Sequence, residues 1–203
     1  MSQARPEIKA TEFLTFLKKG YLTRELVFRG LQLKVWSALI ASLKYRFFAK
    51  GHGVMIDHRA VIDGCRFIEL GDQVWVQRQA WLAVPLLEIQ NIEARPYLKI
   101  GDRTRIGPAC TFSATQSIEI GKSVLFGPNV IILDHHHIYQ NIEVPIMDQG
   151  LSAKGSISIG DQTWVGSNTV IYSASRHLSI GKHCVIGANS FVNSDIPDYS
   201  IAT

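Results

Sequence analysis

The chain has 203 residues, of which 46% are hydrophobic and 19% are charged, and these proportions exclude an intrinsically disordered protein. Three cysteines without a Cys-x-x-Cys pair argue against a disulfide scaffold and a thiolate zinc site, so we expect a reducing, cytoplasmic location. The net charge of +4 is uneven, because residues 1–50 contain ten Lys/Arg and three Asp/Glu whereas the remainder is slightly acidic. The sequence therefore predicts two parts, residues 1–50 and residues 51–203.

The first part has the pattern of a basic amphipathic helix. Apolar residues recur every four positions over 26–48, no acidic residue interrupts this stretch, and Gly51 ends it. The longest uncharged run in its second half, 35–43, is too short to cross a bilayer. We expect a helical cap over the following domain, a peripheral contact of residues 24–50 with the inner face of a membrane, or both. No motif here predicts binding to nucleic acid.

An internal repeat organises residues 51–203. The pattern apolar-x-apolar-Gly occurs five times, each time followed by Asp or Lys, and aliphatic or aromatic residues then recur every six positions. A period of six fits neither a helix nor an isolated strand, and a sheet sandwich would show a period of two. It predicts a chain that turns a corner every six residues, so that three short faces close each turn. We expect the repeated glycine to permit the corner backbone. Its five positions are Gly71, Gly101, Gly121, Gly160 and Gly181.

This repeat resembles that of the hexapeptide-repeat acyltransferases, in particular the sugar and polysaccharide O-acetyltransferases. The most specific stretches run over 157–171 and 185–197. The resemblance implies an all-β domain over 51–203, a left-handed parallel β-helix of about six turns, behind the helical segment. It also implies a homotrimer, acetyl-CoA as the acyl donor, a carbohydrate acceptor and no metal.

Two intervals between repeats are longer than the others, and the second predicts a loop over 133–156 that holds three adjacent histidines. In the family that the chain resembles, one histidine of this loop is the general base, which takes a proton from the acceptor hydroxyl as that oxygen attacks the thioester. The family motif selects His135, with Asp134 as its orienting neighbour. His137 is the alternative, because side chains two apart on an extended segment face the same way, whereas His136 should face the other way.

The resemblance also carries residues of the donor site onto this chain. Trp164 and Ser167 would line the acetyl end of acetyl-CoA, and Ala188, Asn193 and Ser194 would lie along its pantetheine arm. In the family this groove lies between neighbouring β-helices. Asn193 and Ser194 stand where the family often has Thr-Lys, which removes one cation near the cofactor. Trp164 has an equal alternative as a corner residue packed on a neighbouring chain.

The function expected first is O-acetylation of a sugar hydroxyl in a surface glycan or its precursor. Three alternatives stay open. One is N-acetylation of an amino sugar, and another is a non-catalytic solenoid scaffold, although a scaffold needs no histidine-rich excursion. The third is a zinc-dependent protein like the carbonic anhydrases of this fold, with His135, His137 and a third ligand from His177 or His183.

Overall fold

The computed structural model describes residues 45–85, 89, 92–152 and 154–203. The helix expected over 26–48 and the capping or membrane-binding role expected for residues 1–50 therefore lie almost wholly outside the described residues. Of that segment, Ala49–Lys50 forms strand β1, so the repeat domain begins before the boundary that the sequence places at Gly51. Within the described ranges, no helix is long and apolar enough to span a membrane.

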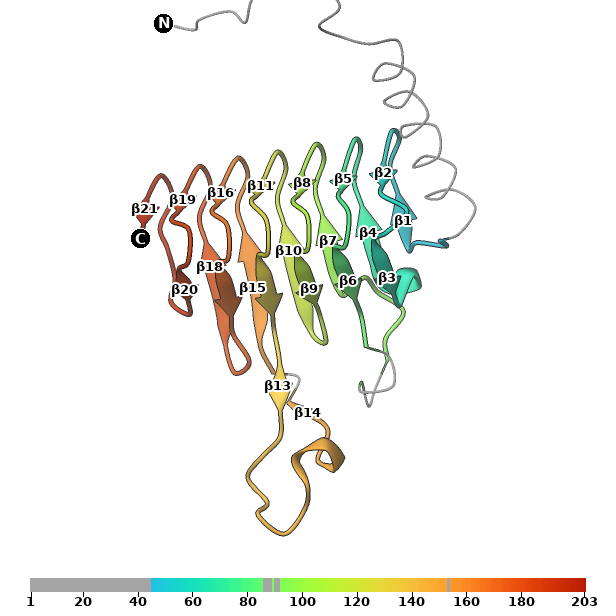
Figure 1. Cartoon of the computed structure of the whole chain (residues 1–203), viewed down its shortest axis with the longest axis vertical. Helices are drawn as coiled ribbons and strands as arrows, with labels where there is room; N and C mark the ends of the chain where they lie inside the picture. The colour runs from blue at the N-terminus through green and yellow to red at the C-terminus, as the bar shows by residue number, and fades with distance from the viewer. Residues whose placement is uncertain (1–44, 86–88, 90–91, 153) are drawn as a thin grey trace, which may run out of the picture. The chain divides into compact units, whose positions relative to one another are not determined.

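The described chain forms three parallel sheets, which we call A, B and C (Figure 1). Sheet A contains β1 (Ala49–Lys50), β4 (Ile68–Leu70), β7 (Leu98–Ile100), β10 (Ser117–Ile120), β15 (Ser156–Ile159) and β18 (His177–Ile180). Sheet B contains β2 (Met55–Ile56), β5 (Trp75–Val76), β8 (Arg105–Ile106), β11 (Leu125–Phe126), β16 (Trp164–Val165), β19 (Val185–Ile186) and β21 (Ile201–Ala202). Sheet C contains β3 (Val61–Asp63), β6 (Trp81–Ala83), β9 (Thr111–Ser113), β12 (Ile131–Leu133), β17 (Val170–Tyr172) and β20 (Phe191–Val192).

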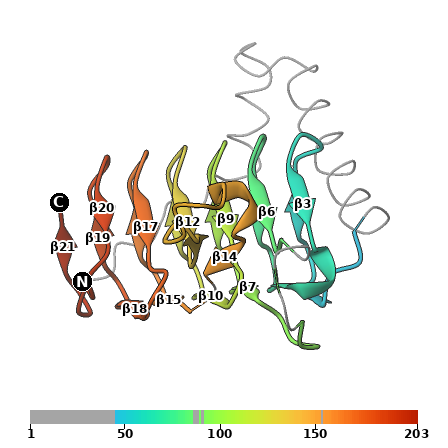
Figure 2. The same ribbon diagram turned by 90° about the horizontal axis from the view of Figure 1, so that it is seen from below.

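The chain visits sheets A, B and C in turn and then starts again one strand further along each sheet, as the views in Figures 1 and 2 show. The domain is a left-handed parallel β-helix. Sheets A and C have six strands each, so it has six turns, and β21 then adds a last strand to sheet B. This confirms the predicted fold class. The repeats also stay in register, since Ile120 of β10 lies opposite Ile100 of β7 and Ile159 of β15.

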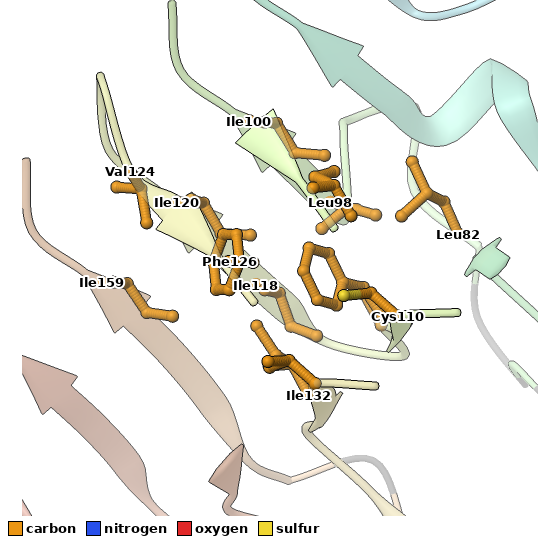
Figure 3. Packing of buried hydrophobic residues seen from close by; sticks show 14 of the residues in the cluster. Leu82, Leu98, Ile100, Cys110, Ile118, Ile120, Val124, Phe126, Ile132 and Ile159 are labelled. Carbon is orange, nitrogen blue, oxygen red and sulfur yellow. The ribbon is translucent and has the colours of Figure 1, made fainter. Parts of the chain in front are cut away.

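The inward side chains of the repeat pack in columns along the helix axis. Ile100, Ile120 and Ile159 occupy the same place on three successive turns and are all buried (Figure 3). Burying a side chain of this size contributes roughly 1.5–3 kcal/mol, so the columns supply the main stabilisation of the stack. At the corners, small polar residues link the turns: the Thr104 hydroxyl donates to the Gly121 carbonyl oxygen (2.9 Å) and accepts from the Val124 N–H (3.2 Å).

The repeated glycines are needed for a different reason from the one expected. None of the five lies in the left-handed region, and the corner is instead made two residues later by residues such as Arg103 and Ser123, at φ 58° and 56°. A Cβ atom on Gly101 would lie 2.6 Å from the carbonyl carbon of Gly121 on the next turn. Glycine is therefore required because successive turns approach closely, and not for its backbone freedom.

Candidate active site

A long loop leaves the stack between sheets C and A, after β12 and before β15. It projects away from the sheets at mid-length of the β-helix (Figure 1). Its two arms pair as antiparallel strands β13 (His136–His137) and β14 (Leu151–Ser152), and a 3₁₀ turn at Ile146–Asp148 lies near its tip. The three histidines thus lie at the base of the loop, beside the body of the domain.

Asp134 fixes the first residue of the loop to the turn before it. The carboxylate is fully buried and accepts four hydrogen bonds, from the backbone N–H groups of Thr115 (2.8 Å), Gln116 (2.8 Å) and Ser117 (2.9 Å) and from the Thr115 hydroxyl (3.0 Å). A buried carboxylate is stable only when it is satisfied in this way. The loop entry is therefore held rigidly to the connection between β9 and β10.

His135 lies directly against this carboxylate. Its Nδ1 is 3.0 Å from the Asp134 Oδ1, and its side chain is only 12% exposed. A buried carboxylate at Nδ1 favours the tautomer that carries its proton there, which leaves Nε2 with a free lone pair. This is the arrangement that a general base requires.

The other two histidines have different surroundings. Nδ1 of His136 lies 3.2 Å from the hydroxyl oxygen of Tyr172, and its ring lies 5.8 Å from the ring of Tyr139. His137 is exposed and lies opposite Leu151 in the strand pair. Of the three, only His135 contacts a carboxylate, and His136 binds the adjacent turn.

The returning arm of the loop passes through a narrow space at Gly155. A Cβ atom there would lie 2.6 Å from the carbonyl oxygen of Asp134 and closer still to that of Ser173. Only glycine fits between the two backbones. The loop is thus fastened at its entry by Asp134 and at its exit by Gly155.

The predicted donor residues are divided between two edges of the β-helix. Trp164 is 51% exposed on the outer face of sheet B, and Ser167 and Ala188 lie at the corners between sheets B and C. Asn193 and Ser194 follow β20, at the edge between sheets C and A from which the histidine loop also leaves. Within one chain, Trp164, Ser167 and Ala188 are therefore on a different edge from the histidines.

The guanidinium of Arg176 lies beside Asn193 and Ser194, where the family often has a lysine. Arg176 donates to the carbonyl oxygen of Asn193 (2.8 Å) and to the carboxylate of Asp195 (3.1 Å). Hydrogen bonds from the Ser179 backbone and the Arg176 side chain lower the pKa of Asp195. The positive charge of Arg176 is therefore paired with the carboxylate of Asp195.

The histidines considered as third zinc ligands are engaged elsewhere. His177 lies between two hydroxyls, with Nδ1 2.9 Å from Ser156 Oγ and Nε2 3.2 Å from Ser158 Oγ. Nδ1 of His183 lies 3.2 Å from the Gln162 side-chain oxygen. Among the residues that the structure describes, no group of three or more His, Cys, Asp or Glu is placed to hold a metal ion.

Sequence reasoning missed three residues that shape this site: Thr115, Tyr172 and Gly155. Thr115 and Tyr172 contact loop residues that are 19 and 36 positions away in the sequence. No local pattern marks them. Gly155 carried a local signal, since it ends the polar stretch immediately before the next repeat, but its function depends on the backbone of a neighbouring turn.

Comparisons with known proteins give the same fold and repeat. The family model for the hexapeptide repeat of succinyl-transferase matches residues 177–194. A probable acetyltransferase of Mycobacterium tuberculosis is 40% identical over 105 residues, which cover 52% of this chain and 34% of that protein. The galactoside O-acetyltransferase of Lactococcus lactis is 34% identical over 42% of this chain and 38% of that protein. That of Escherichia coli is 27% identical over 76% of this chain and 68% of that protein. The chain thus spans well under half the length of the first two.

Solved structures with the same fold are more distant in sequence. AntD, an N-acyltransferase from Bacillus cereus in complex with dTDP and coenzyme A, has a TM-score of 0.62 at 17% identity, over 76% of this chain and 78% of that chain. The acetyltransferase domain of PglB from Neisseria gonorrhoeae, in complex with acetyl coenzyme A, has a TM-score of 0.50 at 16% identity, over 74% and 54%. At this identity the likeness shows the fold alone.

Proposed function

We propose that the chain is a hexapeptide-repeat acetyltransferase and that it transfers the acetyl group of acetyl-CoA to a hydroxyl of a sugar in a surface glycan or its precursor. The observation that carries the proposal is the contact between His135 and the buried Asp134 at the base of the loop. We also propose a cytoplasmic location, where acetyl-CoA is available as the donor.

His135 acts as the base in this reaction. The acceptor hydroxyl donates a hydrogen bond to Nε2, and its oxygen attacks the thioester carbon while Nε2 takes the proton. Asp134 stabilises the resulting imidazolium through the proton on Nδ1. The tetrahedral intermediate then expels the thiolate of coenzyme A, which takes the proton from Nε2. The products are an acetyl ester and coenzyme A with a free thiol.

We propose that the active assembly is a homotrimer with sheets B and C at its interfaces. The outer faces of these sheets carry large apolar side chains, whereas the outer face of sheet A is polar, so B and C are the faces suited to contact. In the proposed trimer, the predicted donor residues of one protomer would lie beside the histidine loop of the next. The exposed apolar residues that we place at the interfaces are Trp75, Leu125, Trp164 and Ile201 on sheet B and Val61 and Trp81 on sheet C. The outward-facing residues of sheet A are instead polar or charged: Glu69, Lys99, Glu119, Ser158 and Ser179.

N-acetylation of an amino sugar is the second candidate, since the AntD structures of similar fold are those of an N-acyltransferase. The same base could take a proton from the amino group of an amino sugar as its nitrogen attacks the thioester. We place O-acetylation first because the galactoside O-acetyltransferase of Escherichia coli aligns with 76% of this chain.

The proposed function is tested with the purified full-length chain, acetyl-CoA and a panel of sugars, with release of the coenzyme A thiol as the readout. The panel contains methyl β-galactoside, maltose and glucosamine. Mild hydroxylamine cleaves O-acetyl esters and leaves N-acetyl amides intact, so treatment of the product separates the two candidates. Release of coenzyme A that no sugar stimulates would count against both.

A further inference from the structure

Four aromatic side chains form a continuous row beside the base of the histidine loop. The ring of Tyr139 lies 5.8 Å from that of His136, whose Nδ1 lies 3.2 Å from the Tyr172 hydroxyl oxygen. The Tyr172 ring in turn stacks on Phe191, with 6.3 Å between ring centroids and 28° between ring planes. We call these four residues the aromatic row.

We propose that the aromatic row binds a neutral sugar unit of the acceptor, an inference that rests on the function proposed above. The row joins the loop, through Tyr139 and His136, to the outer face of sheet C, through Tyr172 and Phe191. It is adjacent to the proposed base, because His136 follows His135 in the chain and Tyr172 pairs with Leu133 of β12. A sugar on the row would therefore have its hydroxyl groups beside His135.

The two ends of the row contribute little to folding. Tyr139 is 60% exposed and Phe191 is 61% exposed, and the core contact at this end of β20 is made by the inward-facing Val192. Exposed rings of this size leave apolar surface available to a ligand. Tyr139 also lines a shallow, open hollow whose other walls are loop residues 141–146.

The middle of the row is ordered without a ligand. The hydrogen bond between Tyr172 and His136 fixes both rings. The hydrogen bonds that the Asp134 carboxylate accepts hold the loop in place two residues before His136. A surface whose side chains are already held in place loses less conformational entropy when a ligand binds. The order of these side chains without a ligand therefore favours a role in binding.

The chemistry of the row indicates the class of ligand. The flat C–H face of a sugar ring packs on aromatic rings, while the Tyr172 hydroxyl and the His136 imidazole offer hydrogen bonds at their edges. None of the four side chains carries a permanent charge. Arg176, a cation on the same edge of the domain, is already bound by Asn193 and Asp195. The row therefore suits a neutral sugar unit better than a sugar phosphate.

The test combines kinetics with a binding measurement that needs no turnover. Tyr139→Leu and Phe191→Leu remove a ring and keep an apolar side chain, whereas Tyr139→Phe and Phe191→Tyr keep the ring. We expect each leucine variant to raise the KM for methyl β-galactoside or maltose about tenfold and to leave the KM for acetyl-CoA within twofold. The ring-preserving variants should resemble the wild type. Saturation-transfer NMR of the same sugars should show contacts at their ring protons that the leucine variants lose.

Tyr199→Leu is the matched control, because Tyr199 is 67% exposed and lies outside the row. Unchanged acceptor KM values in both leucine variants would overturn the inference, as would a rise in the KM for acetyl-CoA instead. If Phe191→Leu alone acts and does so by dissociating the trimer, the ring belongs to an interface and the row is also rejected. Sugar binding is measured without acetyl-CoA, so an inactive enzyme that still binds sugar on the row would reject the proposed function and support the inference.

Discussion

The three histidines of the loop differ in what their ring nitrogens contact, and this predicts different effects of mutation. His135→Ala should lower acetyl transfer by roughly 10²–10⁴-fold, the usual contribution of a positioned general base. His137→Ala should have a smaller effect, because its side chain is exposed and holds no carboxylate. Binding of acetyl-CoA, followed by calorimetry, should be nearly unchanged in both.

A more severe loss in His137→Ala than in His135→Ala would move the base two residues along the loop. This comparison of the two variants does not depend on whether the acceptor is a hydroxyl or an amine.

Gly155 gives a second prediction at the scale of one residue. Gly155→Ala should destabilise the protein by about 1–3 kcal/mol and lower the activity, because the new methyl group would press on the carbonyl oxygen of Asp134. Gly150→Ala is the control, since Gly150 has a positive φ but no atom within 4 Å of a new Cβ, whereas Gly155 has no positive φ and is crowded. Thermal unfolding measures the difference, and a loss in Gly155→Ala no larger than that in Gly150→Ala would contradict the predicted cost of the close backbone approach.

Motif reasoning found Asp134 and His135 because the two are neighbours in the chain. It did not find Tyr172 or Thr115, since their contacts with the loop cross from one turn to the next. Inserted loops change the sequence distance between turns, so such contacts have no fixed spacing. The donor residues were assigned from the family motif, and that assignment remains a prediction.

At the scale of the elements, the repeating turns are linked by carboxylates that follow the repeated glycines. Asp102 accepts a hydrogen bond from the backbone N–H of Asp72 (3.0 Å), and Lys122 lies 2.9 Å from its other oxygen. In the same way Asp161, one turn further along, accepts a hydrogen bond from the backbone N–H of Lys122 (2.7 Å). The sequence showed Asp or Lys after each glycine, and the structure explains the pattern as a bond between successive turns.

These bonds predict how stability depends on pH. Hydrogen bonds from the Lys122 side chain and the Asp72 backbone lower the pKa of Asp102 below its ordinary value of 3.8. The unfolded chain then binds a proton more readily, so this contribution to stability is present above about pH 4 and is lost as the pH falls through the lowered pKa. Thermal unfolding should show a midpoint that falls with acidification, and less steeply in Asp102→Asn. An equal slope in the two proteins would assign the acid sensitivity to other groups.

The period of six was sufficient to predict three faces per turn, the positions of the inward residues and the two long excursions. It could not give the handedness, which came from the resemblance. It also led to the wrong reason for the glycines: Gly101 is fixed by the backbone of the next turn, a contact that one repeat by itself does not contain.

At the scale of the whole molecule, the resemblance to the hexapeptide-repeat acyltransferases predicts a trimer, and the apolar outer faces of sheets B and C predict where its interfaces lie. Sedimentation of the wild type should show a trimer at micromolar concentration. Leu125→Glu, which places a charge on the outer face of sheet B, should dissociate it, whereas Ser158→Glu on sheet A should leave it intact. A wild type that is monomeric under these conditions would exclude a cleft formed between two protomers.

The predicted donor residue Ser167 and the histidine loop lie at different edges of one β-helix, which allows a sharper test of the proposed cleft between protomers. His135→Ala should inactivate the base and Ser167→Trp should block the donor groove, so each variant by itself should be nearly inactive. If each site takes its base from one protomer and its donor residues from the next, mixed trimers will contain interfaces at which both are intact. Random assembly from equal amounts would restore about a quarter of the sites. Co-refolding the two variants should therefore recover activity that neither shows separately. Recovery requires subunit exchange, which a size-tagged copy of one variant would report. If mixed trimers form and remain inactive, the base and the donor groove lie in the same chain, and the assignment of Ser167 to the acetyl end is wrong.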